Sequence, residues 1–148
     1  FNVAQHSVIV TDMCLQLKTD WPVKWQLAAL LHDAPEYVIG DMISPFKAAL
    51  GATYKDVEKG LERAIHLRFS LPPDLPQHVE KLIKKADRAC AYFEATQIAG
   101  FDLAEAEKFF PVPIPIDPLS ISVLNTEDSQ ALYLERFHNL WVRHCDDR

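Results

Sequence analysis

The sequence predicts an all-α fold, and three observations support this prediction. Apolar residues recur at three- and four-residue spacings along most of the 148 residues, which is the period of a helix with one buried face. Only four glycines are present, and alternating β-branched runs that would form hairpins are few. The length and the hydrophobic content of 49% are typical of one domain with a substantial core, so we expect 1–148 to be a single domain.

The first two helices are expected near the start of the chain. The first runs from Val3 to Lys18, and its inner face is set by Val3, His6, Val10, Met13, Cys14 and Leu17. This spacing turns His6 inward. A second helix begins with Pro22 in its first turn, after Asp20 or Trp21 as the cap, and runs to His32.

An irregular junction is expected where the second helix ends. Pro35 has no N–H to donate to the carbonyl of Leu31, so the helix must end, kink or restart around Asp33. The side chains of His32 and Asp33 are therefore expected to leave regular helix geometry at this junction.

Two further helical segments and a loop follow the junction. Gly40 permits a turn, and a short helix is expected from Ser44-Pro45 to Gly51. The next helix has an apolar stripe at Tyr54, Val57, Leu61, Ala64 and Ile65. A cluster of prolines, Pro72, Pro73 and Pro76, marks the loop after it.

A helix expected at 76–98 carries an acid in its apolar face. The buried positions of this helix are Val79, Leu82, Ile83, Ala86 and Cys90. Asp87 lies four residues after Ile83, so its carboxylate is expected to face the core. The residues that carry motifs therefore lie within 1–98.

The C-terminal part, 109–148, is expected to contain an extended segment and one helix. Alternating prolines force 109–118 into an extended conformation, which lies across the helices or reaches a second subunit to form a homodimer. The last helix begins near Asn125 or Thr126, and its buried residues are Tyr133, Phe137, Leu140 and Trp141.

Charge and cysteine usage exclude several classes of partner. The net charge of −6 would repel a polymeric nucleic acid, and no apolar run is long enough to cross a bilayer. Cys14, Cys90 and Cys145 are too few and too widely spaced for a disulfide framework, which favours a reducing cytoplasm. The chain opens at Phe1 rather than Met, so we expect residues upstream of it.

Four polar side chains on three inward faces indicate a metal site. His6, the pair His32-Asp33 and Asp87 are expected on separate helices, each on or beside the face that turns inward. Burying two carboxylates is costly unless they are paired or bound to a metal, and one divalent ion would satisfy all four groups. A set of two imidazoles and two carboxylates is suited to Mn²⁺, Co²⁺, Fe²⁺, Zn²⁺ or Ni²⁺.

Each residue also has a structural interpretation when taken alone. Asp33-Ala34-Pro35-Glu36 matches a capping box, with Asp33 capping a restarted helix and Glu36 reaching back to its backbone. His6 alone would be a hydrogen-bonded core histidine, and Asp87 alone would pair with a lysine or arginine. Among the other histidines, His66 and His78 are expected at the surface and His138 and His144 in structural roles. Only the joint pattern favours a metal.

The combined motifs resemble those of the HD-domain metal-dependent phosphohydrolases, which have His, then His-Asp, then a later Asp on an all-α bundle. The run from His32 to Glu36, the pair Gly40-Asp41 and the segment from Ser44 to Lys47 resemble the branch that contains bacterial 5′-deoxynucleotidases. Gln5-His6-Ser7 and the segment from Lys85 to Arg88 fit the same branch. The similarity covers about 1–94, and no motif was matched in the C-terminal third.

This resemblance implies the roles of individual residues. His6, His32, Asp33 and Asp87 would bind one divalent cation, whereas Glu36 and Asp41 would transfer protons and position the substrate. The activity implied is release of phosphate from a small nucleotide, such as a deoxynucleoside 5′-monophosphate, by attack of metal-bound water.

Two basic residues are candidates for binding phosphate, because each lies beside a motif: Lys47 and Arg88. Two other functions stay open. One is an HD hydrolase that acts on another phosphate ester, a cyclic nucleotide or a nucleotide polyphosphate. The other is a non-catalytic helical binding module stabilised by metal, which would not need Glu36 and Asp41.

Overall fold

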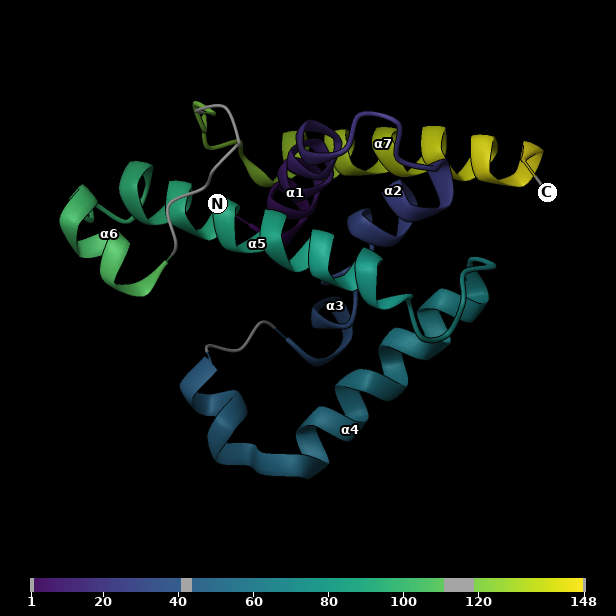
Figure 1. Ribbon diagram of the computed structural model, residues 1–148, viewed down its shortest axis with the longest axis horizontal. Helices are drawn as coiled ribbons and strands as arrows, with labels where there is room; N and C mark the ends of the chain where they lie inside the picture. Colours follow the sequence, from purple (N-terminus) through teal and green to yellow (C-terminus); the bar gives the residue numbers. More distant parts are fainter. Residues whose placement is uncertain (1, 41–43, 111–118, 148) are drawn as a thin grey trace.

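The all-α prediction is confirmed by the computed structural model of the chain, which describes residues 2–40, 44–110 and 119–147 (Figure 1). Of residues 44–49 and 53 only the backbone is described. These parts of the chain form seven helices and no strand.

Four helices enclose the core. They are α1 (Val3–Leu17), α2 (Val23–Leu30), α5 (Gln77–Gln97) and α7 (Thr126–Asp146). Helix α1 packs against α2, α5 and α7, and α2 also packs against α7 (Figure 1). The largest fully buried apolar side chains are those of Val10, Met13, Leu27, Leu30, Val79 and Leu140. The start of α1, of α5 and of α7 agrees with the sequence prediction to within a residue or two.

The junction predicted at Pro35 is present. Helix α2 stops at Leu30, residues 31–35 form turns, and α3 (Glu36–Ile39) is a single helical turn that ends at Gly40 with φ of 83°. Pro35 occupies the N-cap position of α3 and makes no side-chain capping hydrogen bond. The capping-box interpretation of Asp33 is therefore wrong, and its side chain is directed elsewhere.

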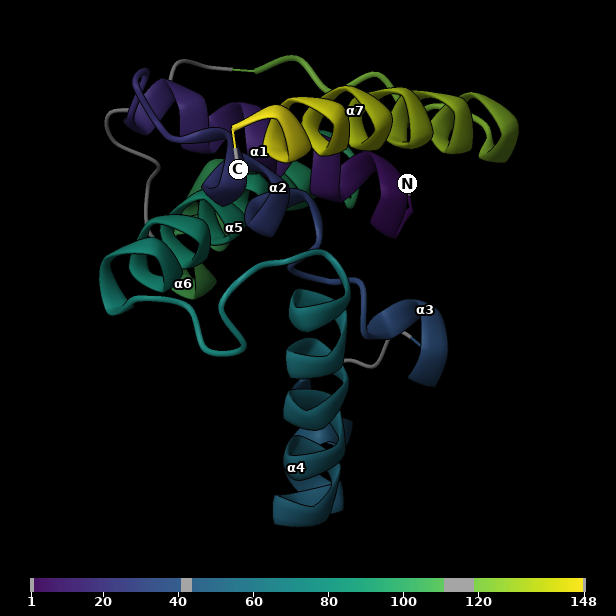
Figure 2. The ribbon, with the colours of Figure 1, turned by 90° about the vertical axis from the view of Figure 1, so that its right-hand side faces the viewer.

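Helix α4 (Ser44–Arg68) consists of two segments that meet at Gly51, as predicted. Gly51 has φ of 72° and ψ of −153°, a conformation that an L-residue adopts only at a cost. The second segment projects from the bundle formed by the other helices (Figure 2). The apolar stripe predicted for it is consequently only partly buried, and Val57 on this stripe is 50% exposed.

Part of the C-terminal region, residues 119–124, connects two core helices through hydrogen bonds. Helix α6 (Leu103–Phe109) packs against α5 and has a capping box formed by Asp102 and Glu105. After it, the amide of Gln5 on α1 donates to the carbonyl of Ser122 at 2.7 Å, and Gln97 on α5 donates to the carbonyl of Leu119 at 2.6 Å. Residues 111–118, which include most of the predicted extended arm, lie outside the described part.

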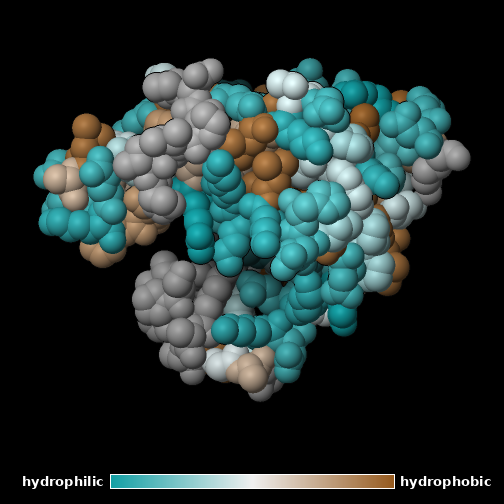
Figure 3. Space-filling model, in the orientation of Figure 1, coloured by the Kyte–Doolittle hydropathy of each residue, from teal (hydrophilic) through white to brown (hydrophobic). Residues whose placement is uncertain are grey.

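The face of the molecule formed by α4 and α5 is polar. In the view of Figure 3, hydrophilic side chains cover most of the face over α4 and α5. Among the residues that the structure describes, no helix combines the length and apolar character required to cross a bilayer.

Candidate metal centre

Three separate elements bring the predicted metal ligands together. His6 lies on α1, His32 and Asp33 lie in the turns that follow α2, and Asp87 lies on α5. The Nε2 atom of His6 is 3.5 Å from Oδ2 of Asp33 and 3.3 Å from Oδ1 of Asp87. The rings of His6 and His32 have centroids 5.4 Å apart. Both histidines lie within 3.5 Å of Asp33, and His6 also contacts Asp87, so the four side chains form one cluster around the point that Nε2 of His6 faces.

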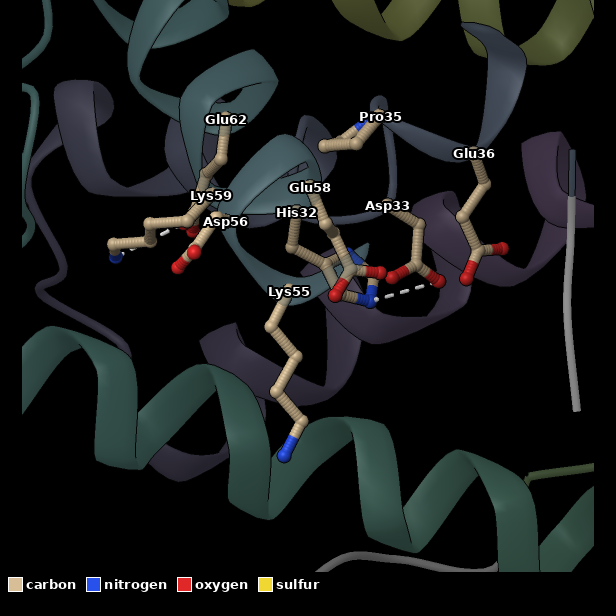
Figure 4. Close-up of a pocket in the computed structure, with 9 residues that line it drawn as sticks. All are labelled: His32, Asp33, Pro35, Glu36, Lys55, Asp56, Glu58, Lys59 and Glu62. Atoms are coloured by element: carbon tan, nitrogen blue, oxygen red, sulfur yellow. Dashed lines mark ion pairs between the residues drawn. The ribbon is translucent and has the colours of Figure 1, made fainter. Parts of the chain in front are cut away.

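His32 presents one nitrogen to this point. Its Nδ1 atom lies 2.8 Å from the carbonyl oxygen of Ala29, so Nδ1–H donates to this oxygen in the neutral ring. Its Nε2 atom is buried without a hydrogen-bond partner and lies 3.3 Å from Oδ2 of Asp33 (Figure 4). Burial also lowers the pKa of His32, which favours the neutral ring that a metal requires.

His6 uses both of its nitrogens. Its Nδ1 atom lies 2.6 Å from Oε1 of Glu94, and its Nε2 atom faces the two aspartates. Burial alone lowers the pKa of His6, but hydrogen bonding to Asp87 and Glu94 outweighs this effect and raises the pKa above the usual range of histidine. Protonation and metal binding therefore compete for Nε2 of His6, the atom that faces both aspartates.

The carboxylate of Asp87 is held in its charged form. Burial acts to raise the pKa of Asp87, but the hydrogen bond with His6 and neighbouring positive charge, including that of Arg88, lower it below the usual range. Asp33 contacts both histidines through the same oxygen, Oδ2. Two anionic oxygens and two imidazole nitrogens thus face one another across a few ångströms.

These donors fit a divalent transition-metal ion. Single ligand atoms of His6, His32 and Asp87 all lie within 4.8 Å of one another, and ligands about 2.1 Å from one ion stand about 3 to 4 Å apart. The buried, unpartnered Nε2 of His32 is the kind of orphaned atom that such an ion would satisfy. The mixed nitrogen and oxygen set suits Mn²⁺, Co²⁺, Fe²⁺, Zn²⁺ or Ni²⁺ better than Mg²⁺.

A cleft of about 590 Å³ opens beside this point (Figure 4). One wall is formed by His32, Asp33, Pro35 and Glu36, and the other by residues of α4, namely Lys55, Asp56, Glu58, Lys59 and Glu62. In this view the ammonium group of Lys55 points away from Asp33 and Glu36, towards α5. The cleft has both acidic and basic groups on its walls, and His32 is the site histidine that lines it where the structure describes it.

The remaining predicted residues are placed unequally. Glu36 is half-buried in the first turn of α3 and lines the cleft beside Asp33. Asp41 lies outside the described residues. Lys47 is on the first segment of α4, and its side chain lies outside the described part as well. Arg88 is exposed on α5, next to Asp87, and does not line the cleft as far as the structure describes it.

Sequence reasoning missed several residues around the site. Glu94 was not selected, although it lies seven residues after Asp87 and four after Cys90, on the same face of α5. The basic and acidic residues of α4 were not selected either, since their spacing is that of an ordinary solvated helix face. The spacing of Glu94 from Asp87 could have indicated this residue from the sequence. Nothing in the sequence distinguished the charged residues of α4.

Three further aromatic side chains are buried. His66 was expected at the surface but is buried at 1% exposure, because the chain folds back after α4 and the carbonyl of Pro73 lies 3.1 Å from its Nδ1. Trp21 and Trp25 are 3% and 8% exposed. They are therefore not available to stack on a nucleobase.

The chain is similar in sequence to a known protein family and to several of its relatives. A family model described as "5′-deoxynucleotidase YfbR-like" matches residues 2–103. An uncharacterized protein of Rhodobacter capsulatus, RCAP_rcc00048, is 44% identical over 142 residues, which is 95% of this chain and 72% of that protein. The uncharacterized protein YfdR of Escherichia coli is 30% identical over 95% of this chain and 71% of its own length. The 5′-deoxynucleotidase YfbR of Shigella flexneri is 31% identical over 85 residues, covering 48% of this chain and 43% of the enzyme.

Proposed function

Because this chain belongs to the 5′-deoxynucleotidase YfbR-like family, we propose that it is a metal-dependent phosphohydrolase that releases phosphate from a deoxynucleoside 5′-monophosphate. The observation that carries this proposal is the convergence of His6, His32, Asp33 and Asp87 beside a cleft of mononucleotide size. When bound there, a divalent ion would polarise the phosphoryl group as a Lewis acid. It would also lower the pKa of a bound water, so that hydroxide is available for attack at neutral pH.

The carboxylate of Glu36 is the residue we assign to proton transfer. It lines the cleft one helical turn after Asp33, so it is close to the metal ligands without being among them. From this position it can take a proton from the attacking water and later deliver one to the departing alkoxide. We also assign proton transfer or substrate positioning to Asp41, which follows Gly40 in the sequence.

Charge in the cleft explains why a metal is needed for the substrate to bind. Five carboxylates line the cleft, those of Asp33, Glu36, Asp56, Glu58 and Glu62, against the two ammonium groups of Lys55 and Lys59. A phosphate dianion is repelled by this excess of negative charge unless a divalent ion compensates for it. We therefore propose that the metal binds before the nucleotide.

Basic side chains complete the proposed phosphate site. Lys47 and Arg88 remain candidates because they flank the motif segments, and Lys55 joins them because it lines the cleft from α4. Lysine and arginine form charge-assisted hydrogen bonds to phosphate oxygens, which makes these three the cations that we expect to select for a phosphate group.

The proposal is tested by a phosphate-release panel on the purified protein loaded in turn with Mn²⁺, Co²⁺, Fe²⁺, Zn²⁺ and Ni²⁺. The substrates are deoxynucleoside 5′-monophosphates, the matching 3′-monophosphates and ribonucleotides, cyclic nucleotides and nucleotide polyphosphates. We expect the deoxynucleoside 5′-monophosphates to be cleaved fastest, and His32→Ala to be inactive. Faster release from a cyclic nucleotide or a polyphosphate would refute the substrate. No release from any compound, with metal bound, would favour a non-catalytic binding module.

A further inference from the structure

The carboxylate of Glu94 makes the shortest contact at the metal centre without facing the point where the ligands converge. Its Oε1 atom lies 2.6 Å from Nδ1 of His6, on the side of the ring opposite to Nε2. The side chain of Glu94 is 28% exposed and that of His6 13%, so the hydrogen bond is largely shielded from water. It joins α5 to α1 across 88 residues of sequence.

A second hydrogen bond fixes Glu94 itself. The thiol of Cys90, one turn earlier on α5 and fully buried, donates to the same Oε1 atom at 3.1 Å. Two donors from two helices therefore meet one carboxylate oxygen. This arrangement restricts the rotamer of Glu94 and keeps its Oε1 within hydrogen-bond distance of the imidazole.

The chemistry of the imidazole then decides which nitrogen can bind a metal. A neutral ring has one N–H donor and one lone pair, and a carboxylate at neutral pH offers acceptors only. The proton of His6 therefore lies on Nδ1 when the ring is neutral, and the lone pair lies on Nε2. This lone pair points to where Asp33 and Asp87 also direct their oxygens.

The two histidines of the centre are supported differently. Nδ1 of His32 donates to a backbone carbonyl, that of Ala29, whereas Nδ1 of His6 donates to a charged carboxylate. A carboxylate acceptor increases the basicity of the ring more than a neutral carbonyl does, and strengthens its bond to a metal. Glu94 thus acts on the ligand from α1, while His32 is oriented by its own turn.

We propose that Glu94 is a positioning residue, which holds His6 in the tautomer and orientation that direct Nε2 at the ion, with Cys90 fixing Glu94 in turn. This inference rests on the proposed metal-dependent function but not on the identity of the substrate. Removal of such an outer carboxylate typically costs 10- to 100-fold in metal affinity. Its effect on turnover is then a consequence of weaker binding rather than of lost proton transfer.

The test measures binding of Co²⁺ and Mn²⁺ to the full chain by competition with a chelator, at one pH and without substrate. The variants are Glu94→Leu, which removes the acceptor, and Glu94→Gln, which keeps an acceptor but removes its charge. Glu80→Gln is the matched control, because Glu80 is exposed on the same helix and lies away from His6. Helical content and the number of ions bound per chain are measured in parallel.

We expect Glu94→Leu to lose about 10- to 100-fold in affinity with one ion still bound at saturation, Glu94→Gln to lose less, and Glu80→Gln to be unchanged. In the ¹⁵N-histidine-labelled zinc form, the Nδ1–H signal of His6 should shift in both Glu94 variants. Unchanged affinity in Glu94→Gln and Glu94→Leu would overturn the inference.

Two other outcomes would also overturn it. If the wild-type chain binds two ions and both Glu94→Leu and Cys90→Ser bind one, then Glu94 and Cys90 are ligands of a second ion. A wild-type chain that binds no divalent ion refutes both this inference and the proposed function. A chain that binds metal but hydrolyses nothing refutes only the proposed function.

Discussion

His32 and Asp33 are neighbours in sequence, yet Nε2 of the first lies 3.3 Å from Oδ2 of the second, and both face His6. Consecutive residues on a regular helix diverge by about 100° around the axis, so this convergence requires that the helix has already ended. Helix α2 stops at Leu30, and the turns forced by Pro35 bring the two side chains to one side. The candidate metal centre thus depends on the end of α2 at Leu30.

Replacing Glu36 by glutamine should abolish most of the turnover but not the binding of metal. The amide keeps the shape of the side chain but cannot accept a proton, and general acid–base catalysis contributes about 10²- to 10⁴-fold in rate. The measurement is kcat with a saturating deoxynucleotide, together with the number of ions per chain. Glu107→Gln, an exposed carboxylate on α6, is the control. Wild-type turnover in the Glu36 variant would exclude this role.

A divalent ion should stabilise the wild-type chain and not His32→Ala. An ion at 100 times its Kd adds about 2.7 kcal/mol to the free energy of unfolding, which corresponds to a rise in Tm of about 5 to 10 °C. Thermal unfolding followed by circular dichroism, with the ion and with a chelator, measures both. An equal rise in the two proteins would show that the ion binds somewhere other than at His32.

Replacing Lys55 by methionine should weaken substrate binding more than it lowers kcat. Loss of one charge-assisted contact from an exposed lysine corresponds to a rise of about tenfold in KM. Lys81→Met is the matched control, since Lys81 is exposed on α5 and does not line the cleft where it is described. Identical KM values for the wild type and the Lys55 variant would remove Lys55 from the phosphate site.

Two leucines of α7 should differ sharply in their contribution to stability. Leu140 is 2% exposed and Leu134 is 53% exposed. Leu140→Ala leaves a cavity in the core and should cost about 2 to 5 kcal/mol, whereas Leu134→Ala should change the free energy of unfolding by about 0.5 kcal/mol or less. Urea unfolding of both variants gives this comparison, and similar losses would contradict the placement of α7.

Cysteine reactivity should follow burial. Burial raises the pKa of Cys14 to about 12, so at pH 8 only about one molecule in 10⁴ carries the thiolate that reacts. Cys145 is partly exposed near the end of α7. A disulfide reagent should therefore modify Cys145 first, and Cys145→Ser should remove the fast phase while Cys14→Ser should not. If the fast phase instead disappeared in Cys14→Ser, the core around α1 would be opening to the reagent.

Local rules were enough to select the four candidate ligands, because each of them is marked by its own element. His6 and Asp87 interrupt apolar stripes of period 3.6, and Pro35 marks where His32 and Asp33 leave the helix. These signals need no knowledge of how the helices pack.

Neither the wall of the cleft on α4 nor the hydrogen bond between Glu94 and His6 was predicted, because both depend on how the helices pack. Lys55 and Glu58 look like a solvated helix face until Gly51 redirects α4 towards the turn after α2. Glu94 shares a face of α5 with Asp87 and Cys90, but its partner His6 comes from another helix, and this pairing is not specified by the sequence. The prediction that His66 lies at the surface was wrong for the same reason. The carbonyl of Pro73 that contacts His66 belongs to a loop whose path the sequence does not specify.

Hydrogen bonds from Gln5 and Gln97 connect residues 119–124 to the candidate metal centre. Gln5 lies on the helix that bears His6, and Gln97 lies on the helix that bears Asp87. Opening of residues 119–124 would remove this connection between the two helices, and an ion bound between the helices would oppose the opening by mass action. Amide exchange at Ile121 and Leu124, whose N–H groups donate to the two glutamines, should consequently slow when the ion binds.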